Sequence, residues 1–268
     1  MKRSMKRLLL RACNPLDHVV RRINGKQDLP PLDLRWDVGP LRSFEAAAAE
    51  FRVFLKLFAG LSPSSHVLDI GCGCGQIALQ LTPVLGEQGR YAGYDINRRA
   101  IGWCHNHIAR RDGRFSFHHM DVRNGMYNPG GRISASEWTF PVDGQTFDII
   151  LLKSVFTHML RNEVLNYLRQ IPSLLRTGGK CVATFFLLND RQRTMADRNR
   201  VKFSPGSDGV AFANPAIPEA IVAFEEADVL EMVARHELRL ASPIEHGNWT
   251  GDTAALSHQD ILILEHIG

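Results

Sequence analysis

The chain has 268 residues, 44% of them hydrophobic and 22% charged, and its formal net charge is +4. This length suits one domain of roughly 200–250 residues with a large core and an appendage. No run approaches the roughly 18 apolar residues of a membrane-spanning helix. Outside the first 30 residues the charge is close to neutral, so we expect no nucleic-acid partner either.

Residues 1–42 form a separate, basic region of the sequence. Residues 1–30 hold eight Lys or Arg against two Asp, and a proline-rich stretch follows. We predict a basic N-terminal arm and leave three roles open: a solvated tail, a cap over a bound cofactor, or a weak contact with an anionic membrane surface. The apolar run at 8–10 is too short for a signal-peptide core. Five cysteines without framework spacing indicate reduced thiols and a cytoplasmic location.

Helices and strands alternate through residues 43–268, the predicted main domain. This alternation is typical of an open, doubly wound α/β sheet that binds its ligand at the carboxyl ends of the strands. The segments 123–146 and 189–217 are too long for plain connections and are expected to be substrate or lid loops. Helices are expected at 43–60, 77–85, 97–110, 161–175 and 223–236, and strands at 66–70, 90–96, 115–121, 147–152, 180–188, 238–241 and 259–266.

The first strand of this domain leads into a glycine-rich turn with the sequence VLDIGCGCG. Glycines allow the backbone to approach a ligand closely, and the helix that follows offers unpaired N–H groups. A dinucleotide fingerprint would need a third glycine at position 76, where Gln76 stands. Asp69 before the turn would repel a diphosphate and attract an amino group. The turn therefore favours a cofactor with a cationic end.

Two further acids follow the next two predicted strands. Asp95 ends the second strand and could accept both hydroxyls of a ribose, and Asp121 ends the third strand, where it could accept from an adenine amino group. A single Asp at a strand end is often a helix cap or a turn former. Three acids at successive strand ends, in register with a glycine turn, favour a nucleoside cofactor.

With these residues the sequence resembles the class I S-adenosylmethionine-dependent methyltransferases, over roughly residues 61–267. The segments that carry the resemblance are VLDIGCGCG, YAGYDIN, FHHMDVRN, FDIILLKSVFTHML and LLRTGGKCVATFF. The run DVRNGMYNPGG and the later TFFLLND look like a bacterial subgroup that methylates small molecules. The resemblance implies a Rossmann-like, seven-stranded, doubly wound sheet whose last strand is antiparallel.

The resemblance also implies a cofactor-binding set. Asp69 and the turn would surround the methionine part, Asp95 would hold the ribose, and Asp121 would lie at the adenine edge. The last two members of the set would line the floor near the methyl group. The full set is Asp69, Gly71, Cys72, Gly73, Gly75, Asp95, Ile96, Asp121, Val122, Lys153 and Ser154.

Methyl transfer to a hydroxyl needs a base, and His158 is the candidate. It follows the fourth strand closely, and the ordinary pKa of a histidine, about 6.5, suits proton transfer. A structural histidine at a helix start is the alternative. No Asp, Glu and His cluster has the spacing of a metal site. Side chains that could line the acceptor site are Tyr127, Asn128, His246, Trp249 and His258, where an exposed Trp would suit stacking on a sugar or ring. The alternative is a plain turn for the first two residues and a structural role for the other three.

The leading interpretation is an S-adenosylmethionine-dependent enzyme that methylates a small molecule at a hydroxyl of a saccharide, glycolipid or natural product. The alternatives are a methyltransferase acting on nitrogen or carbon and a non-catalytic scaffold that binds the cofactor. A nicotinamide-dependent oxidoreductase is disfavoured by Gln76. The identity of the acceptor and the oligomeric state are not predicted.

Overall fold

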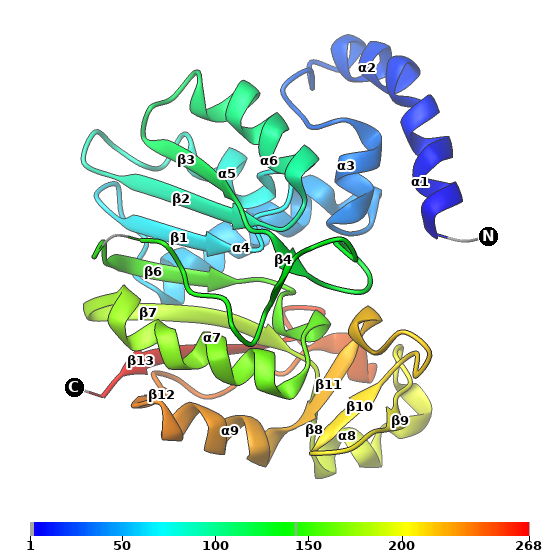
Figure 1. Ribbon diagram of the computed structural model, residues 1–268, viewed down its shortest axis with the longest axis vertical. Helices are drawn as coiled ribbons and strands as arrows, with labels where there is room; N and C mark the ends of the chain where they lie inside the picture. The colour runs from blue at the N-terminus through cyan, green and yellow to red at the C-terminus, as the bar shows by residue number, and fades with distance from the viewer. Residues whose placement is uncertain (1–2, 143, 268) are drawn as a thin grey trace.

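A computed structural model describes residues 3–142 and 144–267 of the chain (Figure 1). Its centre is a seven-stranded sheet in the order β12-β13-β7-β6-β1-β2-β3. Strand β13 runs antiparallel to both of its neighbours, and the other six strands are parallel to one another. The predicted sheet with an antiparallel last strand is confirmed. The strands are β1 (His66–Ile70), β2 (Arg90–Asp95), β3 (Phe115–His119), β6 (Phe147–Leu152), β7 (Leu175–Phe185), β12 (Leu238–Leu240) and β13 (Asp260–His266).

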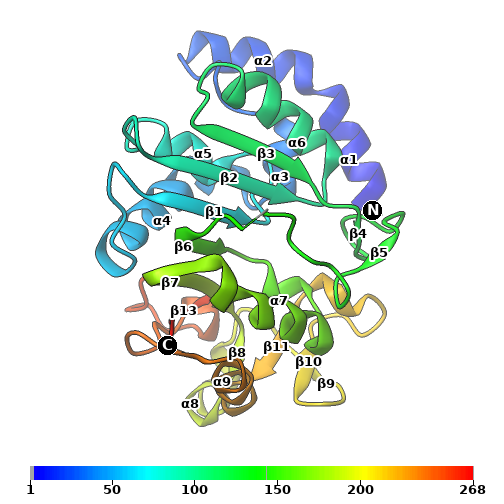
Figure 2. The ribbon, with the colours of Figure 1, turned by 60° about the vertical axis from the view of Figure 1, so that its left-hand side comes forward.

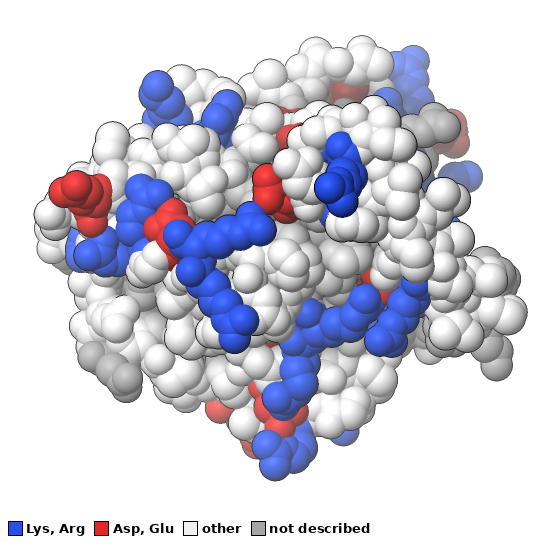
Figure 3. Space-filling model, turned by 90° about the horizontal axis from the view of Figure 1, so that it is seen from above, with Lys and Arg blue, Asp and Glu red and all other residues white. Residues whose placement is uncertain are grey.

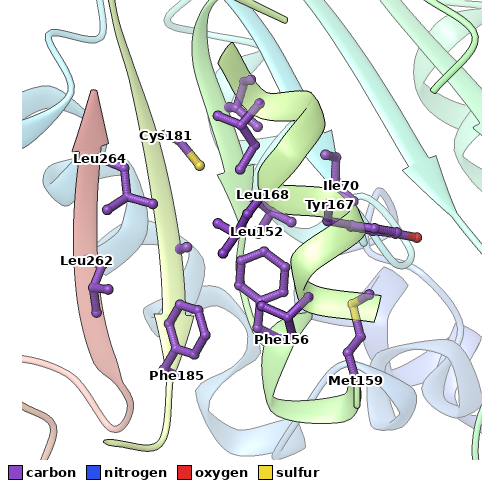
Figure 4. Close-up of a cluster of buried hydrophobic side chains, with 14 of the residues drawn as sticks. Ile70, Leu152, Phe156, Met159, Tyr167, Leu168, Cys181, Phe185, Leu262 and Leu264 are labelled. Carbon is purple, nitrogen blue, oxygen red and sulfur yellow. The ribbon is translucent and has the colours of Figure 1, made fainter. Parts of the chain in front are cut away.

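Helices cover both faces of this sheet. Successive side chains of a strand point to opposite faces, so Val67 packs on one face with helices α4–α6, and Leu68 on the other with α7 and α9. Figure 4 shows the second core, in which side chains of α7 meet those of β6, β7 and β13. The helices are α4 (Phe44–Phe58), α5 (Gln76–Leu81), α6 (Arg98–Cys104) with a π-helical end (His105–Ala109), α7 (Arg161–Leu174) and α9 (Glu226–Arg235).

The segment 189–217, expected as a substrate or lid loop, contains short helices and strands joined by irregular chain. It contributes to a second, four-stranded sheet in the order β8-β11-β10-β9 and carries helix α8. A helix was expected to start at residue 223, but residues 222–225 form strand β11, whose Phe224 and Glu225 pair with β8. The parts of this small sheet and its helical turns are β8 (Leu187–Leu188), α8 (Asp190–Thr194), η4 (Ala196–Arg198), β9 (Ser204–Pro205), β10 (Val210–Phe212), η5 (Pro218–Ala220) and β11 (Val222–Glu225).

The region after β3 is closer to the expectation. Most of 123–146 is irregular, with one short parallel pair between β4 (Val122–Arg123) and β5 (Ile133–Ser134). Two short 3₁₀ turns, η3 (Phe156–His158) and η6 (Asn248–Thr250), follow β6 and precede β13. Both lie in connections at the carboxyl edge of the sheet, where a doubly wound fold binds its ligand.

The N-terminal region forms three α-helices and a 3₁₀ turn: α1 (Arg3–Ala12), α2 (Asn14–Ile23), α3 (Leu32–Asp37) and η1 (Leu41–Ser43). Figures 1 and 2 both show α1 and α2 at one margin of the molecule, with α3 between them and the sheet. Among the described residues, no helix is long and apolar enough to cross a membrane. The arm is therefore helical, and its inner helix lies beside the glycine turn.

Candidate active site

The turn after β1 is bound to the neighbouring strand through its backbone. The N–H groups of Gly71 and Cys72 both donate to the carbonyl oxygen of Tyr94, at 2.7 and 3.1 Å. Cys72 is buried and its side chain packs in the core, so a contact with a cofactor would involve its backbone. Gly75 precedes α5 directly and has a positive φ of 75°. The turn thus places a helix N-terminus at the end of β1.

Two valines from distant segments pack against this turn. A Cβ atom added to Gly71 would lie 2.5 Å from Val155 Cγ2, and one added to Gly73 would lie 2.4 Å from Val38 Cγ1. Any side chain at either glycine would push these segments away. Val38 follows α3 of the arm, and Val155 follows β6. The glycines therefore allow both segments to close on the turn from two sides.

Asp95 ends β2 and faces the turn. Its Oδ2 accepts from the Gly73 N–H at 2.7 Å, and its Oδ1 accepts from the Asn97 N–H at 2.6 Å. Burial raises the pKa of this carboxyl above its usual value, while the two N–H groups oppose the shift. A carboxylate oxygen can accept more than one hydrogen bond, so Asp95 can hold the turn and still accept from ribose hydroxyls. The fit to a nucleoside is good here.

The predicted adenine edge is partly covered. Asp121 is hydrogen-bonded to Arg132, which lowers the pKa of the Asp121 carboxyl. Val122 points into the core, so only its backbone faces the site. Ile96 is partly buried at the edge of the core. An adenine amino group at Asp121 would share this carboxylate with Arg132.

Asp69 lies on the same face of the sheet as Val67, which is the face covered by α4–α6. It accepts a hydrogen bond from the hydroxyl of Tyr91, and its side chain is buried. Burial raises the pKa of Asp69 to about 7, against the opposing effects of Tyr91 and of the nearby Lys153 ammonium. The predicted direct contact with the methionine amino group remains a prediction.

Lys153 joins Asp69 to helices α4 and α5. Its Nζ donates to Gln76 Oε1 at 3.1 Å and lies 5.0 Å from the centre of the Phe51 ring. Burial lowers the pKa of Lys153 and raises that of its neighbour Glu50. Lys153 therefore belongs to a buried polar network beside the turn, and its place on the floor of the site remains a prediction.

Ser154 has a φ of 56°, one of three positive values among the described non-glycine residues. Its N–H donates to Thr184 Oγ1 at 2.7 Å, and its hydroxyl donates to Gln259 Oε1 at 2.9 Å. The Thr184 hydroxyl donates to the same Gln259 oxygen at 2.7 Å. These bonds hold the ends of β6, β7 and β13 together and maintain an uncommon backbone conformation at the site.

His158 lies one turn beyond Val155, and its N–H donates to the Val155 carbonyl at 2.9 Å. Its Nδ1 is 3.1 Å from the carbonyl oxygen of Glu219, which can only accept, so Nδ1 carries the proton. The Nε2 of the neutral ring is then an acceptor and lies 3.4 Å from the Tyr127 hydroxyl. The structure thus brings two predicted residues together and fixes the tautomer that a base needs.

Asn124 and Asn128 shape the loop that carries Tyr127. The Asn124 side chain donates to the His158 carbonyl at 2.9 Å, and the Asn128 side chain donates to the Val122 carbonyl at 2.9 Å. The two backbones pair with each other. Asn128 therefore closes the loop, and Tyr127 reaches the histidine.

The segment before β13 is organised around the buried Asp260. Trp249 was a candidate to line the acceptor site if exposed, but it is fully buried and its Nε1 donates to Asp260 Oδ2 at 2.8 Å, which agrees with the structural alternative. An indole stabilises a core by burial and a single hydrogen bond. His246 Nδ1 lies 3.5 Å from Asp260, which raises the pKa of this histidine. His258 is exposed, and its Nδ1 lies 3.1 Å from Asn248 Oδ1.

An open cavity of about 480 Å³ lies in the unit formed by the small sheet. Its lining includes Arg193, Lys202 and Phe203 from the segment that follows β8. All of its lining residues fall within 188–225. Neither His158 nor Tyr127 is among the residues that line this cavity.

Several residues of the site carry no local signal in the sequence. Val38 and Glu219 reach the site from segments far from the glycine turn in the sequence. Tyr91 of β2 is bonded to Asp69, and Gln259, directly before β13, is bonded to Ser154. A pairing of Asp69 with Tyr91 could have been expected, since both lie on the same face of adjacent strands. The other three depend on tertiary packing.

The chain matches a known family over this region. Residues 61–202, slightly more than half of the 268 residues, match the family model described as a methyltransferase domain. The matched range begins before β1 and ends within the small sheet's unit, so it contains the glycine turn, Asp95, Asp121 and His158.

Solved structures share the fold at low sequence identity. With the 1,6-didemethyltoxoflavin-N1-methyltransferase of Burkholderia thailandensis, solved with S-adenosylhomocysteine, the identity is 18% and the TM-score 0.55, over 88% of each chain. The CcbJ methyltransferase of Streptomyces caelestis shares 14% identity with a TM-score of 0.54, and the match covers 87% of this chain and 92% of that one. The mitomycin 7-O-methyltransferase MmcR shares 14% identity with a TM-score of 0.52. This match covers 84% of this chain but only about half, 54%, of that one.

The family match and the geometry agree. The glycine turn, Asp95 at the end of β2 and the sheet order occur together in one chain. The matched range, residues 61–202, contains both the turn and Asp95. The chain belongs to the methyltransferase domain family and is a class I enzyme that uses S-adenosylmethionine.

Proposed function

We propose that this enzyme methylates a hydroxyl group of a small molecule, with His158 as the base. The observation that carries the proposal is the position of His158, one turn beyond the valine that packs on Gly71. The proton of a hydroxyl must leave as the new bond forms, and a base with an ordinary pKa near neutrality removes it efficiently. The same arrangement would be superfluous for an acceptor that is already a free amine.

The bound cofactor supplies a methyl group on a positively charged sulfur. The chain's own residues would do the rest. Asp95 would orient the nucleoside, and the turn would hold the amino acid part next to the N-terminus of α5. His158 would accept the hydroxyl proton at Nε2, while the Glu219 carbonyl keeps the other proton on Nδ1. Tyr127 would contact the acceptor or the ring of the base.

The surrounding segments would set which acceptor fits. We propose that α3 and Val38 cap the cofactor and that the segment 189–217 limits the acceptor side. A saccharide, a glycolipid headgroup or a natural product with a hydroxyl is the class of acceptor we favour. The fold relatives include proteins named for O-methylation and for N-methylation, so the acceptor atom is for experiment to decide.

The test compares His158→Gln with wild type on a panel of hydroxyl and amine acceptors, at saturating S-adenosylmethionine. We expect a loss of kcat on the order of 10²–10⁴-fold for a hydroxyl acceptor, because general base catalysis contributes about that much. The residual rate should rise with pH, as solvent hydroxide replaces the base.

His266→Gln is the matched control, since His266 ends β13 at the opposite edge of the sheet. It should keep the wild-type rate. If His158→Gln methylates every accepted hydroxyl at nearly the wild-type rate, then His158 is a structural residue and the proposal is wrong. Turnover of amines alone would assign the enzyme to nitrogen instead.

A further inference from the structure

The two outer helices of the arm present an apolar stripe to solvent. Its members recur every three or four residues through α1 and α2, which places them on one side of the helices. Leu8 and Leu16 are each 68% exposed, and Ile23 is 78% exposed. The stripe consists of Met5, Leu8, Leu9, Leu16, Val19, Val20 and Ile23.

This orientation is opposite to that of an ordinary surface helix, because the polar side of the arm faces the protein. Arg7 pairs with Asp37 at 2.8 Å, and the Asn14 side chain donates to Asp33 at 2.8 Å. Asp17 is bonded to Arg35 of α3 and to Arg21 of its own helix. These polar bonds hold α1 and α2 with the apolar stripe turned outward.

The stripe is a patch, unlike the single exposed apolar side chains found on most proteins. Of the fourteen exposed large hydrophobic residues among the described ones, seven lie in it, within nineteen residues of chain. Contiguous apolar surface of this kind marks a site of interaction with a partner or a membrane. The stripe therefore calls for an occupant.

The charges beside the stripe are basic. Arg11 and Arg22 are exposed, and neither forms an ion pair within the described residues, whereas the Lys6 Nζ lies 5.1 Å from the centre of the Trp36 ring of α3. Of the two acids in residues 1–30, Asp17 is bonded to α3 and Asp28 to Arg111. Figure 3, seen from above, shows a face with more Lys and Arg than Asp and Glu. A second copy of this arm would bring like charges together, whereas an anionic lipid surface would complement them.

We propose that α1 and α2 dock on an anionic membrane surface, with the apolar stripe immersed at the headgroup boundary and Arg11 and Arg22 against the lipid phosphates. Helices with an apolar face and basic flanks lie in the membrane interface in this way. Their affinity depends on the apolar area that they bury and on the attraction between their basic side chains and anionic lipids. The polar bonds to α3 fix the orientation, so docking needs no unfolding of the arm.

The first experiment is cosedimentation of the full-length enzyme with vesicles of phosphatidylcholine, alone or mixed with phosphatidylglycerol. Wild type should bind the mixed vesicles and bind phosphatidylcholine weakly. The triple variant Leu9→Gln/Leu16→Gln/Ile23→Gln should lower the partition coefficient about tenfold or more, because it removes apolar area from the interface. Val53→Gln/Leu57→Gln is the matched control, since both residues are exposed and apolar but lie on α4. It should bind like wild type.

The second experiment tests the charges. Arg11→Gln/Arg22→Gln should weaken binding to the mixed vesicles several-fold and reduce its dependence on salt, because these charges contact the anionic surface. Lys56→Gln/Lys202→Gln removes two exposed charges elsewhere and should have little effect. Equal losses in both variants would mean that net charge alone drives the association, and the proposed orientation would be wrong.

A label on Cys13 reports the orientation directly. Cys13 is exposed between the two helices, and the other four cysteines are buried. An environment-sensitive dye there should shift its emission to the blue on mixed vesicles in wild type, and not in the stripe variant.

The proposal is overturned if wild type binds neither kind of vesicle, or if the stripe variant binds as well as wild type. A dimer of wild type in analytical ultracentrifugation that the stripe variant abolishes, without vesicle binding, would assign the stripe to a second copy. Circular dichroism and S-adenosylhomocysteine binding of each variant show that it is folded. Methyl transfer in detergent-free solution is measured separately, so failure of docking leaves the proposed chemistry untouched.

Discussion

The cofactor side and the acceptor side of the site are built in different ways. The cofactor side depends on residues 69–95, which run from the end of β1 through the glycine turn and α5 to the end of β2. Backbone N–H groups of the turn donate to Tyr94 and Asp95 at the end of β2. The acceptor side brings together Tyr127, His158 and Glu219 from three connections spread over more than ninety residues. The first is a local motif and the second is a product of tertiary packing.

This difference has consequences for mutation. The carboxylate of Asp95 holds the Gly73 N–H of the turn, so its loss should weaken cofactor binding strongly. A cluster assembled from loops can shift, so its residues should affect rate more than folding. Replacements on the two sides can therefore strengthen or refute the contrast between them.

The largest effect is expected for Asp95→Ala. The change removes the partner of the Gly73 N–H and the acceptor for the ribose together, so affinity for S-adenosylhomocysteine should fall by more than about a hundredfold, or roughly 3 kcal/mol. Isothermal titration calorimetry measures it. The control is Asp148→Ala, a carboxylate that bonds the His66 N–H at the other end of β1. It should cost stability but leave affinity intact. Binding unchanged in Asp95→Ala would remove the basis for the cofactor side.

A smaller effect is expected for Gly73→Ala. The new methyl group would meet Val38 Cγ1 at 2.4 Å and would strain a backbone with φ of 55°, so affinity for S-adenosylhomocysteine should fall on the order of tenfold. Gly178→Ala is the matched control, because Gly178 also has a positive φ of 79° but open space around it. The backbone strain should lower the thermal stability of Gly178→Ala and leave its affinity for S-adenosylhomocysteine unchanged. Equal affinities in both variants would mean that the contact of Val38 with the turn does not matter.

The last effect is on stability and not on affinity, and it concerns Asp69 and pH. Its pKa in the folded protein is about 7 because of burial, and about 3.9 in an unfolded chain. The folded state keeps the proton to higher pH, so the free energy of unfolding should fall as pH rises between about 4 and about 7. Asp69→Asn removes this titration and should reduce the fall by on the order of 1–3 kcal/mol. Urea unfolding of wild type and Asp69→Asn near pH 5 and pH 8 tests it. If the free energy of unfolding changes equally with pH in both proteins, a buried, titrating Asp69 is contradicted.

The sequence predicts the cofactor side well because its signals are local. The central strands fall close to the expected residues, and the glycine spacing, Asp95 and the antiparallel last strand need only neighbouring residues or the resemblance. The expected helix start at Ala223 is wrong because strand pairing with β8 overrides an apolar run that suits either state. The burial of Trp249 depends on Asp260 and on the small sheet, which no local pattern announces. Glu219 contributes a backbone carbonyl, for which any residue would serve.

The most direct test of the account is a crystal structure with S-adenosylhomocysteine bound, read for the distance from its sulfur to His158 Nε2. An acceptor oxygen must lie about 3 Å from the base and about 3–3.5 Å from the transferred methyl. The account therefore predicts the ribose at Asp95, the amino acid part at the glycine turn, and a separation from sulfur to Nε2 of no more than about 8 Å. A sulfur well beyond that distance, or a ribose away from Asp95, would contradict it.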